Sequence, residues 1–103
     1  DIYSGTMVNA DASADMLTLL KAQTRTGKIP SGIPSGVETA NKTGELSAGD
    51  GLGVVENDIA IVFDKEHPYV LCVLSNNIRN NSSAQETIQK ISADVYQYMT
   101  SRK

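Results

Sequence analysis

The sequence lacks several features that whole classes of protein require. It has no tryptophan and only one cysteine and one histidine among its 103 residues. A single cysteine excludes a disulfide within the chain and leaves a metal cluster without a basis. No apolar run approaches the roughly 18 residues that a membrane-spanning helix needs. We therefore predict no metal, no cofactor and no membrane span in this segment.

Positive charge is also scarce. Nine lysines and arginines face twelve aspartates and glutamates, which gives a net charge of −3. The basic residues are scattered, and a nucleic-acid partner usually requires a basic patch, so none is expected. A hydrophobic content of 40% is typical of a globular chain. The length fits one small domain or part of a larger one.

The residues that could carry isolated chemistry have simpler interpretations. Cys72 lies inside the apolar run Tyr69–Leu74 and is predicted to be a buried, inert thiol. His67 precedes Pro68 and is interpreted as a turn residue. The segment Ser47–Gly53 has the glycines of a phosphate-binding loop without its lysine, so a hairpin turn is favoured.

Two helices are predicted. The segment Asp1–Gly5 resembles the last turn of a helix closed by a glycine, which suggests that this sequence starts inside a longer one. Asn9 can cap a helix from about Ala10 to Thr24, whose apolar stripe is Met16, Leu17 and Leu20. A second helix is expected from a Ser83–Glu86 capping box. Its stripe comprises Ile88, Ile91, Val95, Tyr98 and Met99.

Between these helices the pattern indicates a connector and three strands. Pro30 and Pro34 stiffen the connector 28–36, and Ile29 and Ile33 suggest that it packs onto the body. The predicted strands are Val37–Gly44, Asp58–Asp64 and Tyr69–Ser75, with a tight turn at Lys65–Pro68. Strands that are apolar on both faces are predicted to be covered on both sides.

The predicted fold is α+β, with three antiparallel strands flanked by an N-terminal and a C-terminal helix. We expect the two helices to cover one face of the sheet well. The other face and an open edge would then invite self-association or a partner.

One motif carries chemistry. Lys42, Thr43 and Gly44 form a Lys-Thr-Gly sequence at a strand end, followed by Glu45. A lysine can supply positive potential to an anionic group, a threonine hydroxyl can donate to it, and a glycine keeps the strand edge bare. The tripeptide also arises by chance, so a surface Lys-Thr pair at a strand end is the alternative interpretation.

The context of the motif resembles class A β-lactamases. Residues 28–46 are similar to the approach to the active-site strand of that family, and Glu56–Val62 and Tyr69–Leu74 resemble its next two strands. The two predicted helices resemble the helix before the connector and the C-terminal helix, so the resemblance covers essentially the whole chain. It implies a bacterial, extracytoplasmic or secreted serine hydrolase acting on a β-lactam or a D-alanyl peptide.

The resemblance also implies the roles of the site residues. Lys42 would be catalytic, Thr43 and Gly44 would line the substrate pocket, and the backbone N–H of Glu45 would be an oxyanion-hole donor. The sequence departs from the family at the nucleophile, because no serine here begins a Ser-x-x-Lys motif and no Ser-Asp-Asn occurs. We interpret residues 1–103 as the C-terminal part of such a domain, inert alone and dependent on an upstream half.

Glu56 is a second departure. It stands where many class A β-lactamases have an arginine that holds the substrate carboxylate, and a glutamate there would repel that group. The alternative is a solvated acid at a strand edge. Either interpretation keeps two other functions open, namely a D-alanyl-D-alanine peptidase and a non-catalytic binding or assembly module that reuses the fold.

Overall fold

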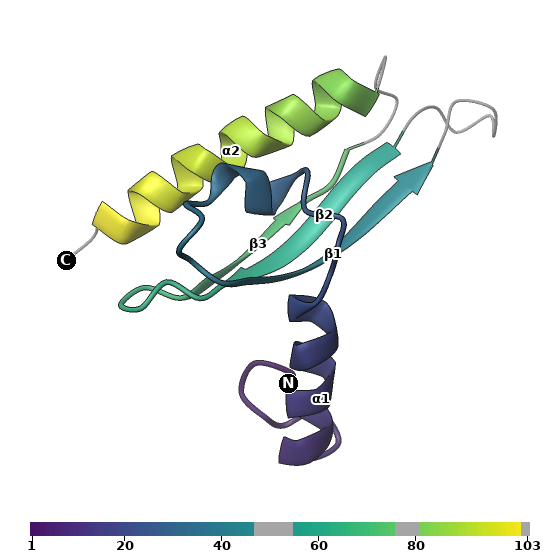
Figure 1. Ribbon diagram of the computed structural model, residues 1–103, viewed down its shortest axis with the longest axis vertical. Helices are drawn as coiled ribbons and strands as arrows, with labels where there is room; N and C mark the ends of the chain where they lie inside the picture. The colour runs from purple at the N-terminus through teal and green to yellow at the C-terminus, as the bar shows by residue number, and fades with distance from the viewer. Residues whose placement is uncertain (47–54, 76–80, 102–103) are drawn as a thin grey trace.

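The computed structural model describes residues 1–46, 55–75 and 81–101, and it has the predicted α+β fold (Figure 1). In chain order the elements are α1 (Ala10–Lys21), the 3-10 helix η1 (Ile29–Gly32), β1 (Thr39–Leu46), β2 (Val55–Val62), β3 (Tyr69–Val73) and α2 (Asn81–Ser101). The strands form one antiparallel sheet in the order β1-β2-β3.

The sheet has two faces of different character, because successive side chains of a strand point to opposite sides. The register pairs Thr43 with Asp58 and Lys42 with Ile59. We call one side the helix face, formed by Asn41, Thr43, Glu45, Glu56, Asp58, Ala60, Val62, Leu71 and Val73. We call the other the open face, formed by Ala40, Lys42, Ile59, Ile61, Val70 and Cys72.

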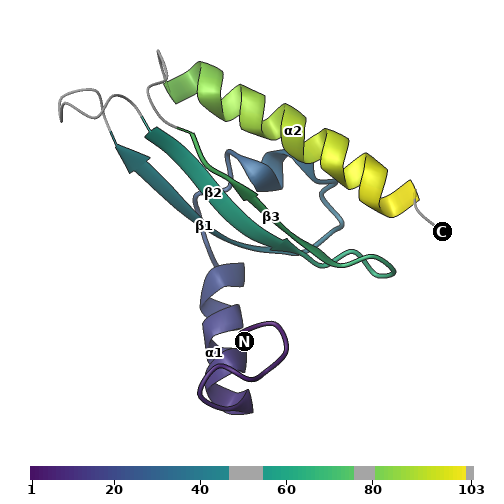
Figure 2. The same ribbon diagram turned by 180° about the vertical axis from the view of Figure 1, so that it is seen from behind.

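The helix face holds the core. Ile29 of η1, Ala60 of β2 and Ile88 of α2 pack together, and Leu71 and Val73 lie against them. Both ribbon views show α2 running along this face with η1 beside it (Figures 1 and 2). The prediction that Ile29 and Ile33 pack the connector onto the body is confirmed, since they are 0% and 8% exposed.

Helix α1 lies on the other side of the sheet. Its predicted cap is confirmed, because Asn9 Oδ1 accepts the N–H of Ala12 at 2.8 Å, but the helix ends at Lys21 rather than at Thr24. Leu20 lies with Ile59 on the open face. The expectation that both helices cover one face is therefore wrong, because the connector passes from the open face to the helix face.

The turn before α1 matches its prediction. Gly5 has a φ of +80°, and the N–H of Thr6 donates to the carbonyl of Asp1 at 2.9 Å. This is the hydrogen-bond pattern that closes many helix C-termini, in which glycine adopts the left-handed conformation without strain. Tyr3 in this turn stacks on Phe63 after β2 at 6.0 Å between ring centroids, which holds the segment near the sheet.

Strand β3 is less covered than predicted. Cys72 is exposed rather than buried, and Val70 and Leu74 are 62% and 74% exposed. Cys72 and Val70 lie on the open face, where α1 packs mainly against β1. Local sequence pattern shows that a strand is apolar, but it does not show whether another element covers it.

Helix α2 differs from its prediction in its start and its packing. It begins at Asn81, which places Ser83 inside the first turn rather than at the cap. The buried residues are Ala84, Ile88 and Ser92, whereas Tyr98 of the predicted stripe is 61% exposed. Ser92 is small where η1 approaches the helix too closely for a large side chain. Gly32 of η1 has room for no Cβ, which would stand 2.4 Å from the carbonyl oxygen of Gln89.

The predicted turn after β2 is confirmed, with the Asp64 carboxylate accepting the backbone N–H of His67 at 3.0 Å. Across the described ranges, neither helix has the length and apolarity to cross a bilayer. The same residues contain no group of three His, Cys, Asp or Glu side chains placed to hold a metal ion.

Candidate functional site

The Lys-Thr-Gly motif lies in β1, the edge strand of the described sheet. Its side chains lie on two faces. Lys42 is exposed on the open face, where its Nζ donates to the Thr43 carbonyl at 2.9 Å. Thr43 is 7% exposed on the helix face. A ligand could therefore reach both side chains only by lying along the free edge of β1.

Gly44 is not required by packing among the described residues. A Cβ at this position would meet Asn57 at 3.8 Å, which is ordinary van der Waals contact, and its φ is not in the left-handed region. The strand would tolerate a small side chain here as far as its own neighbours are concerned. The space at Gly44 is consequently free to serve a molecule that approaches the edge from outside.

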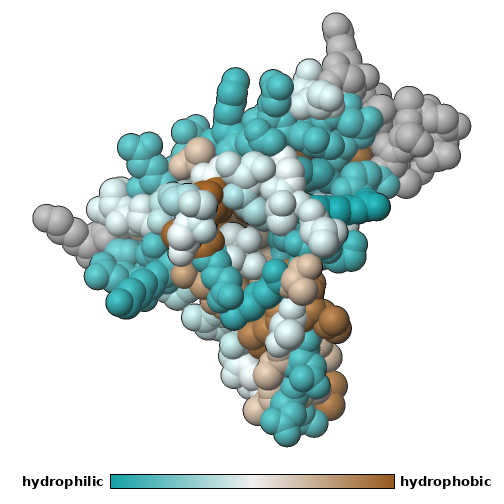
Figure 3. Space-filling model, viewed as in Figure 1, coloured by the Kyte–Doolittle hydropathy of each residue, from teal (hydrophilic) through white to brown (hydrophobic). Residues whose placement is uncertain are grey.

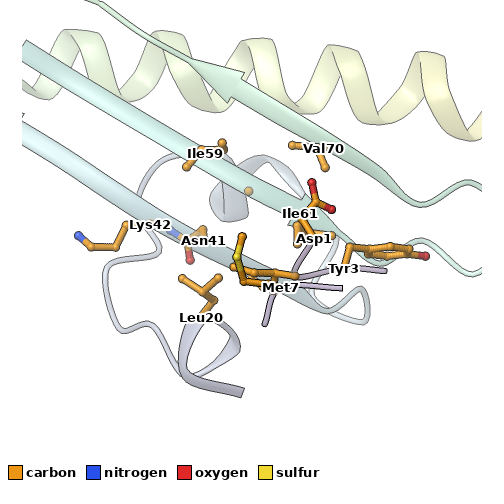
Figure 4. A pocket seen from close by; sticks show the side chains of 12 residues that line it. Asp1, Tyr3, Met7, Leu20, Asn41, Lys42, Ile59, Ile61 and Val70 are labelled. Carbon is orange, nitrogen blue, oxygen red and sulfur yellow. The ribbon is translucent and has the colours of Figure 1, made fainter. Parts of the chain in front are cut away.

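Lys42 stands at the rim of an apolar hollow on the open face. The hollow has a volume of about 350 Å³ and lies between the sheet, α1 and the N-terminal turn. Met7 and Leu20 approach it from one side and Ile59, Ile61 and Val70 from the sheet (Figure 4). Hydrophobic surface also gathers over α1 and its junction with the sheet (Figure 3). A cationic side chain thus borders an apolar surface that the described residues leave open.

A buried lysine organises the opposite face. Lys28 follows Gly27 in the connector and is only 3% exposed. Its Nζ lies 2.5 Å from Glu56 Oε2 and 2.9 Å from Glu45 Oε1, and it donates to the Asn57 carbonyl at 2.9 Å. A buried ammonium needs such partners, because its transfer from water is otherwise very unfavourable. Lys28 therefore links the connector to β1 and β2.

Glu56 is neither solvated nor uncompensated. Its side chain is 1% exposed, and Asn81 and Gln85 of α2 donate to Oε1 at 2.6 and 3.2 Å. Burial acts to raise the pKa of Glu56, but hydrogen bonds from Lys28, Asn81 and Gln85 and the Lys28 charge outweigh it and lower the pKa. The interpretation as a solvated strand-edge acid is wrong, because the alternation of β2 places Glu56 on the helix face.

Asp58 and Asn41 fix the connector beside this cluster. Asp58 is 1% exposed and accepts the N–H of Ile29 at 3.0 Å and the Asn41 amide at 3.1 Å. Asn41 also donates to the Arg25 carbonyl at 3.1 Å. Burial raises the pKa of Asp58 despite these bonds. Asn41, the residue before the Lys-Thr-Gly motif, thus links β1 to the connector at Arg25 and to Asp58, which in turn binds Ile29.

The Glu45 side chain joins the same network. Its Oε2 lies 3.0 Å from Arg25 Nη1, and its Oε1 pairs with Lys28. The buried Thr43 hydroxyl lies beside this carboxylate without reaching full hydrogen-bond geometry. Burial acts to raise the pKa of Glu45, but Lys28, Thr43 and Arg25 together lower it. The family resemblance implied a role only for the backbone N–H of Glu45, as an oxyanion-hole donor, and none for its side chain.

Sequence reasoning missed Lys28, Arg25 and Asp58. The available signal was the period of two in Glu56-x-Asp58-x-Ala60-x-Val62, which places two carboxylates on the same side as two apolar residues. Carboxylates on a buried face require a cation or donors. That pattern predicts a buried cation, although it does not identify which one.

This chain resembles known proteins more clearly in structure than in sequence. No curated protein matches the sequence significantly. The structure of PBP-A matches with a TM-score of 0.84 and 22% identity over 98% of this chain and 36% of that one. The β-lactamase from Sphaerobacter thermophilus DSM 20745 matches with 0.84 and 20%, over 99% and 37%. The ancestral GNCA class A β-lactamase gives 0.74 and 21%, over 89% and 35%.

These solved structures share the fold, and this chain spans about a third of their length. The model of the Beta-lactamase enzyme family (Beta-lactamase2) matches residues 1–99, which is nearly the whole chain. The chain therefore belongs to the β-lactamase enzyme family.

Proposed function

We propose that this chain forms the Lys-Thr-Gly wall of a serine β-lactamase active site, and that the acylated serine lies outside these 103 residues. The observation that carries the proposal is the exposed Lys42 at the edge of β1, beside an open apolar face and a glycine that internal packing does not require. Family membership agrees with this assignment.

The proposed reaction is acyl transfer. The serine hydroxyl loses its proton as its oxygen attacks the β-lactam carbonyl, the ring C–N bond breaks and the ring nitrogen takes up a proton. Water later hydrolyses the acyl-serine ester to a carboxylic acid and the free serine. Lys42 supplies positive potential to the nucleophile and to the substrate, and the backbone N–H of Glu45 donates to the oxyanion. Thr43 and Gly44 line the strand edge along which the substrate lies. The chain itself contains no Ser-x-x-Lys motif that could provide the nucleophile.

The open face of the sheet has the character of a contact surface for another part of the protein. Ile59 and Val70 are 47% and 62% exposed there, and Lys42 lies on the same side. Apolar patches of this kind mark contact surfaces. We propose that a part of the protein outside these 103 residues carries the serine and covers this face, which would bring the serine to the Lys42 side of the sheet.

Substitution of Lys42 tests the catalytic assignment in the protein at its natural length, meaning the gene product that carries this chain. Lys42→Ala should lower the rate of acylation by a chromogenic cephalosporin by about a hundredfold or more, since it removes a charge that stabilises the transition state. The melting temperature should hardly change, because Lys42 is not part of the hydrophobic core of this chain. Lys65→Ala, in the exposed turn after β2, is the matched control. Parental kinetics in Lys42→Ala would overturn the proposal.

A D-alanyl-D-alanine peptidase is the second candidate. It is favoured by Glu56, because the position where many class A enzymes carry an arginine holds an acid already paired with Lys28. Both functions begin with serine acylation, so the lifetime of the acyl-enzyme separates them. Release of penicilloate within seconds supports a β-lactamase, whereas a penicilloyl adduct that persists for hours, together with cleavage of a D-alanyl-D-alanine peptide, supports the peptidase.

A further inference from the structure

The side chain of Asn41 lies between two groups that accept hydrogen bonds. Its Nδ2 donates to Asp58 Oδ1 at 3.1 Å and to the carbonyl oxygen of Arg25 at 3.1 Å. The other Asp58 oxygen accepts the N–H of Ile29 at 3.0 Å, so both oxygens act as acceptors. An asparagine amide supplies two donors, whereas a leucine or an ionised aspartate of similar size supplies none. Asn41 and Asp58 are 2% and 1% exposed, so water cannot readily replace either bond.

These two bonds brace the strand that carries Lys42. Among the described residues β1 pairs with β2 alone, so one side of its backbone is free. Asn41 adds a tie across to Asp58 of β2 and a second tie to the connector at Arg25. Because Asn41 and Lys42 are consecutive, a buried bond on the helix face fixes the backbone from which Lys42 reaches the open face.

The charges around Asn41 favour a neutral side chain there. Two cations face three acids on this side of the sheet, namely Arg25 and Lys28 against Glu45, Glu56 and Asp58. The groups that η1 and α2 direct at these acids are neutral, namely the Ile29 N–H and the amides of Asn81 and Gln85. A carboxylate at position 41 would therefore add an uncompensated charge in contact with Asp58. Two carboxylates that close retain one proton between them, because both cannot readily ionise.

We propose that Asn41 is a positioning residue for acylation, because its amide, held between Asp58 and the Arg25 carbonyl, fixes the β1 backbone that carries Lys42. The inference rests on the proposed function, which makes the location of the Lys42 ammonium important for the rate. Asn41 acts through Lys42 and not by contact with the substrate. A misplacement of about 1 Å in a catalytic group can cost about a hundredfold in rate. Loss of the Asn41 bonds should therefore slow acylation more than it weakens penicillin binding.

The test replaces Asn41 with aspartate in the protein at its natural length. Asn41→Asp keeps the size of the side chain, but it has one donor when the carboxyl pair holds a proton and none when both are ionised. Repulsion within the pair raises one pKa, so the proton is present at low pH and is lost as the pH rises. The rate constant for acylation by a fluorescent penicillin, relative to the parent at the same pH, should fall about tenfold between about pH 5 and pH 8. Apparent penicillin affinity should change by less than about threefold.

A control and a rescue accompany this variant. Asn9→Asp makes the same chemical change at the exposed cap of α1, where aspartate accepts the Ala12 N–H equally well. Its rate relative to the parent should stay near one at every pH. The double variant Asn41→Asp with Asp58→Asn exchanges donor and acceptor and removes the second charge. It should abolish the dependence on pH and recover part of the rate, although the bond to the Arg25 carbonyl stays absent.

Hydrogen–deuterium exchange over the same pH range gives a measurement that does not depend on activity. In Asn41→Asp, peptides from residues 39–46 should lose protection relative to the parent as the pH rises, while peptides from residues 81–101 keep it. Parental acylation at every pH, a rate ratio that does not change with pH, or equal loss of protection in both regions would overturn the inference. If the parent is never acylated but residues 39–46 lose protection as described, the proposed function fails while the bracing of β1 by Asn41 stands.

Discussion

At the scale of single residues, the buried pair of Lys28 and Glu56 decides how the site is held. Both side chains are nearly inaccessible, and each has additional partners that satisfy it. Removing two charges from water costs about as much as their attraction returns, so such a pair contributes little net stability. Removing one partner, however, leaves a buried charge uncompensated. The pair therefore specifies position more than it stabilises.

Removal of one partner should accordingly be more harmful than removal of both. Glu56→Gln should lower the free energy of unfolding by about 3 kcal/mol, since Lys28 loses its closest counter-charge. The double variant Lys28→Met with Glu56→Leu should lose less than Glu56→Gln alone. Urea unfolding of the protein at its natural length provides the measurement. A double variant that loses as much as the sum of its two single variants would contradict this view of the pair.

The same residues predict a dependence on pH. The pKa values of Glu45 and Glu56 are lowered in the folded state, so their stabilisation is present above their unfolded pKa of about 4.3 and is lost as the pH falls below it. The raised pKa of Asp58 acts with the opposite sign, as a cost at neutral pH that fades on acidification. Melting temperature should fall between pH 5 and pH 3, and less steeply in Glu56→Gln. A steeper fall in that variant would show the sign to be wrong.

The role of a side chain could be predicted from the sequence only where its hydrogen-bond or ion-pair partner lies nearby in the sequence. Asn9 was identified as a cap because its partner is the N–H of Ala12, within the same turn. The sequence left open the alternative that Glu56 is a solvated acid, because its partner, Lys28, lies far away in the sequence and its neighbours in β2 are polar. Lys42 and Thr43 were proposed as site residues from their motif, and their separation onto two faces follows from strand alternation.

At the scale of elements, close packing between η1 and α2 organises the helix face of the sheet. Ser92 Oγ donates to the Ile29 carbonyl at 2.7 Å, and Gly32 approaches the α2 backbone too closely for a side chain. Periodicity predicted that α2 exists and packs on the sheet. It did not predict which stripe packs, because η1 lies between the sheet and the helix at Ser92 and fixes which side of α2 is buried there. A connector's path depends on distant contacts such as that of Asp58 with Ile29.

Gly32→Ala tests this contact. The new methyl group would stand 2.4 Å from the Gln89 carbonyl oxygen, so η1 and α2 must separate. We expect a loss of about 1–3 kcal/mol in the free energy of unfolding, as for other overpacked positions. Gly36→Ala is the control, because a Cβ there meets nothing within 4 Å. Equal stability of the two variants would show that η1 does not press on α2.

At the scale of the whole molecule, the sheet is covered by α2 and η1 on one face and only partly by α1 on the other (Figures 1 and 2). The sequence predicted an uncovered apolar patch, and Ile59, Val70 and Leu74 are indeed exposed. What covers the patch cannot be read from these residues, because an apolar surface records the need for a partner and not its identity.

We predict that the isolated 103-residue chain associates through the open face. Light scattering should give a mass above 11.0 kDa, and Val70→Glu should reduce the association by placing a charge on that face. Leu19→Glu is the matched control, since Leu19 is 75% exposed on α1 and does not line the open-face hollow. A wild-type chain that stays monomeric at every concentration would contradict the prediction.

The most direct test of the central claim is intact-protein mass spectrometry after incubation with a penicillin. The account predicts that the 103-residue chain gains no mass, whereas the protein at its natural length gains one penicilloyl group on a serine outside Asp1–Lys103. Peptide mapping locates the modified residue. A stoichiometric penicilloyl adduct on any serine of this chain would show that the chain carries its own nucleophile and would contradict the account.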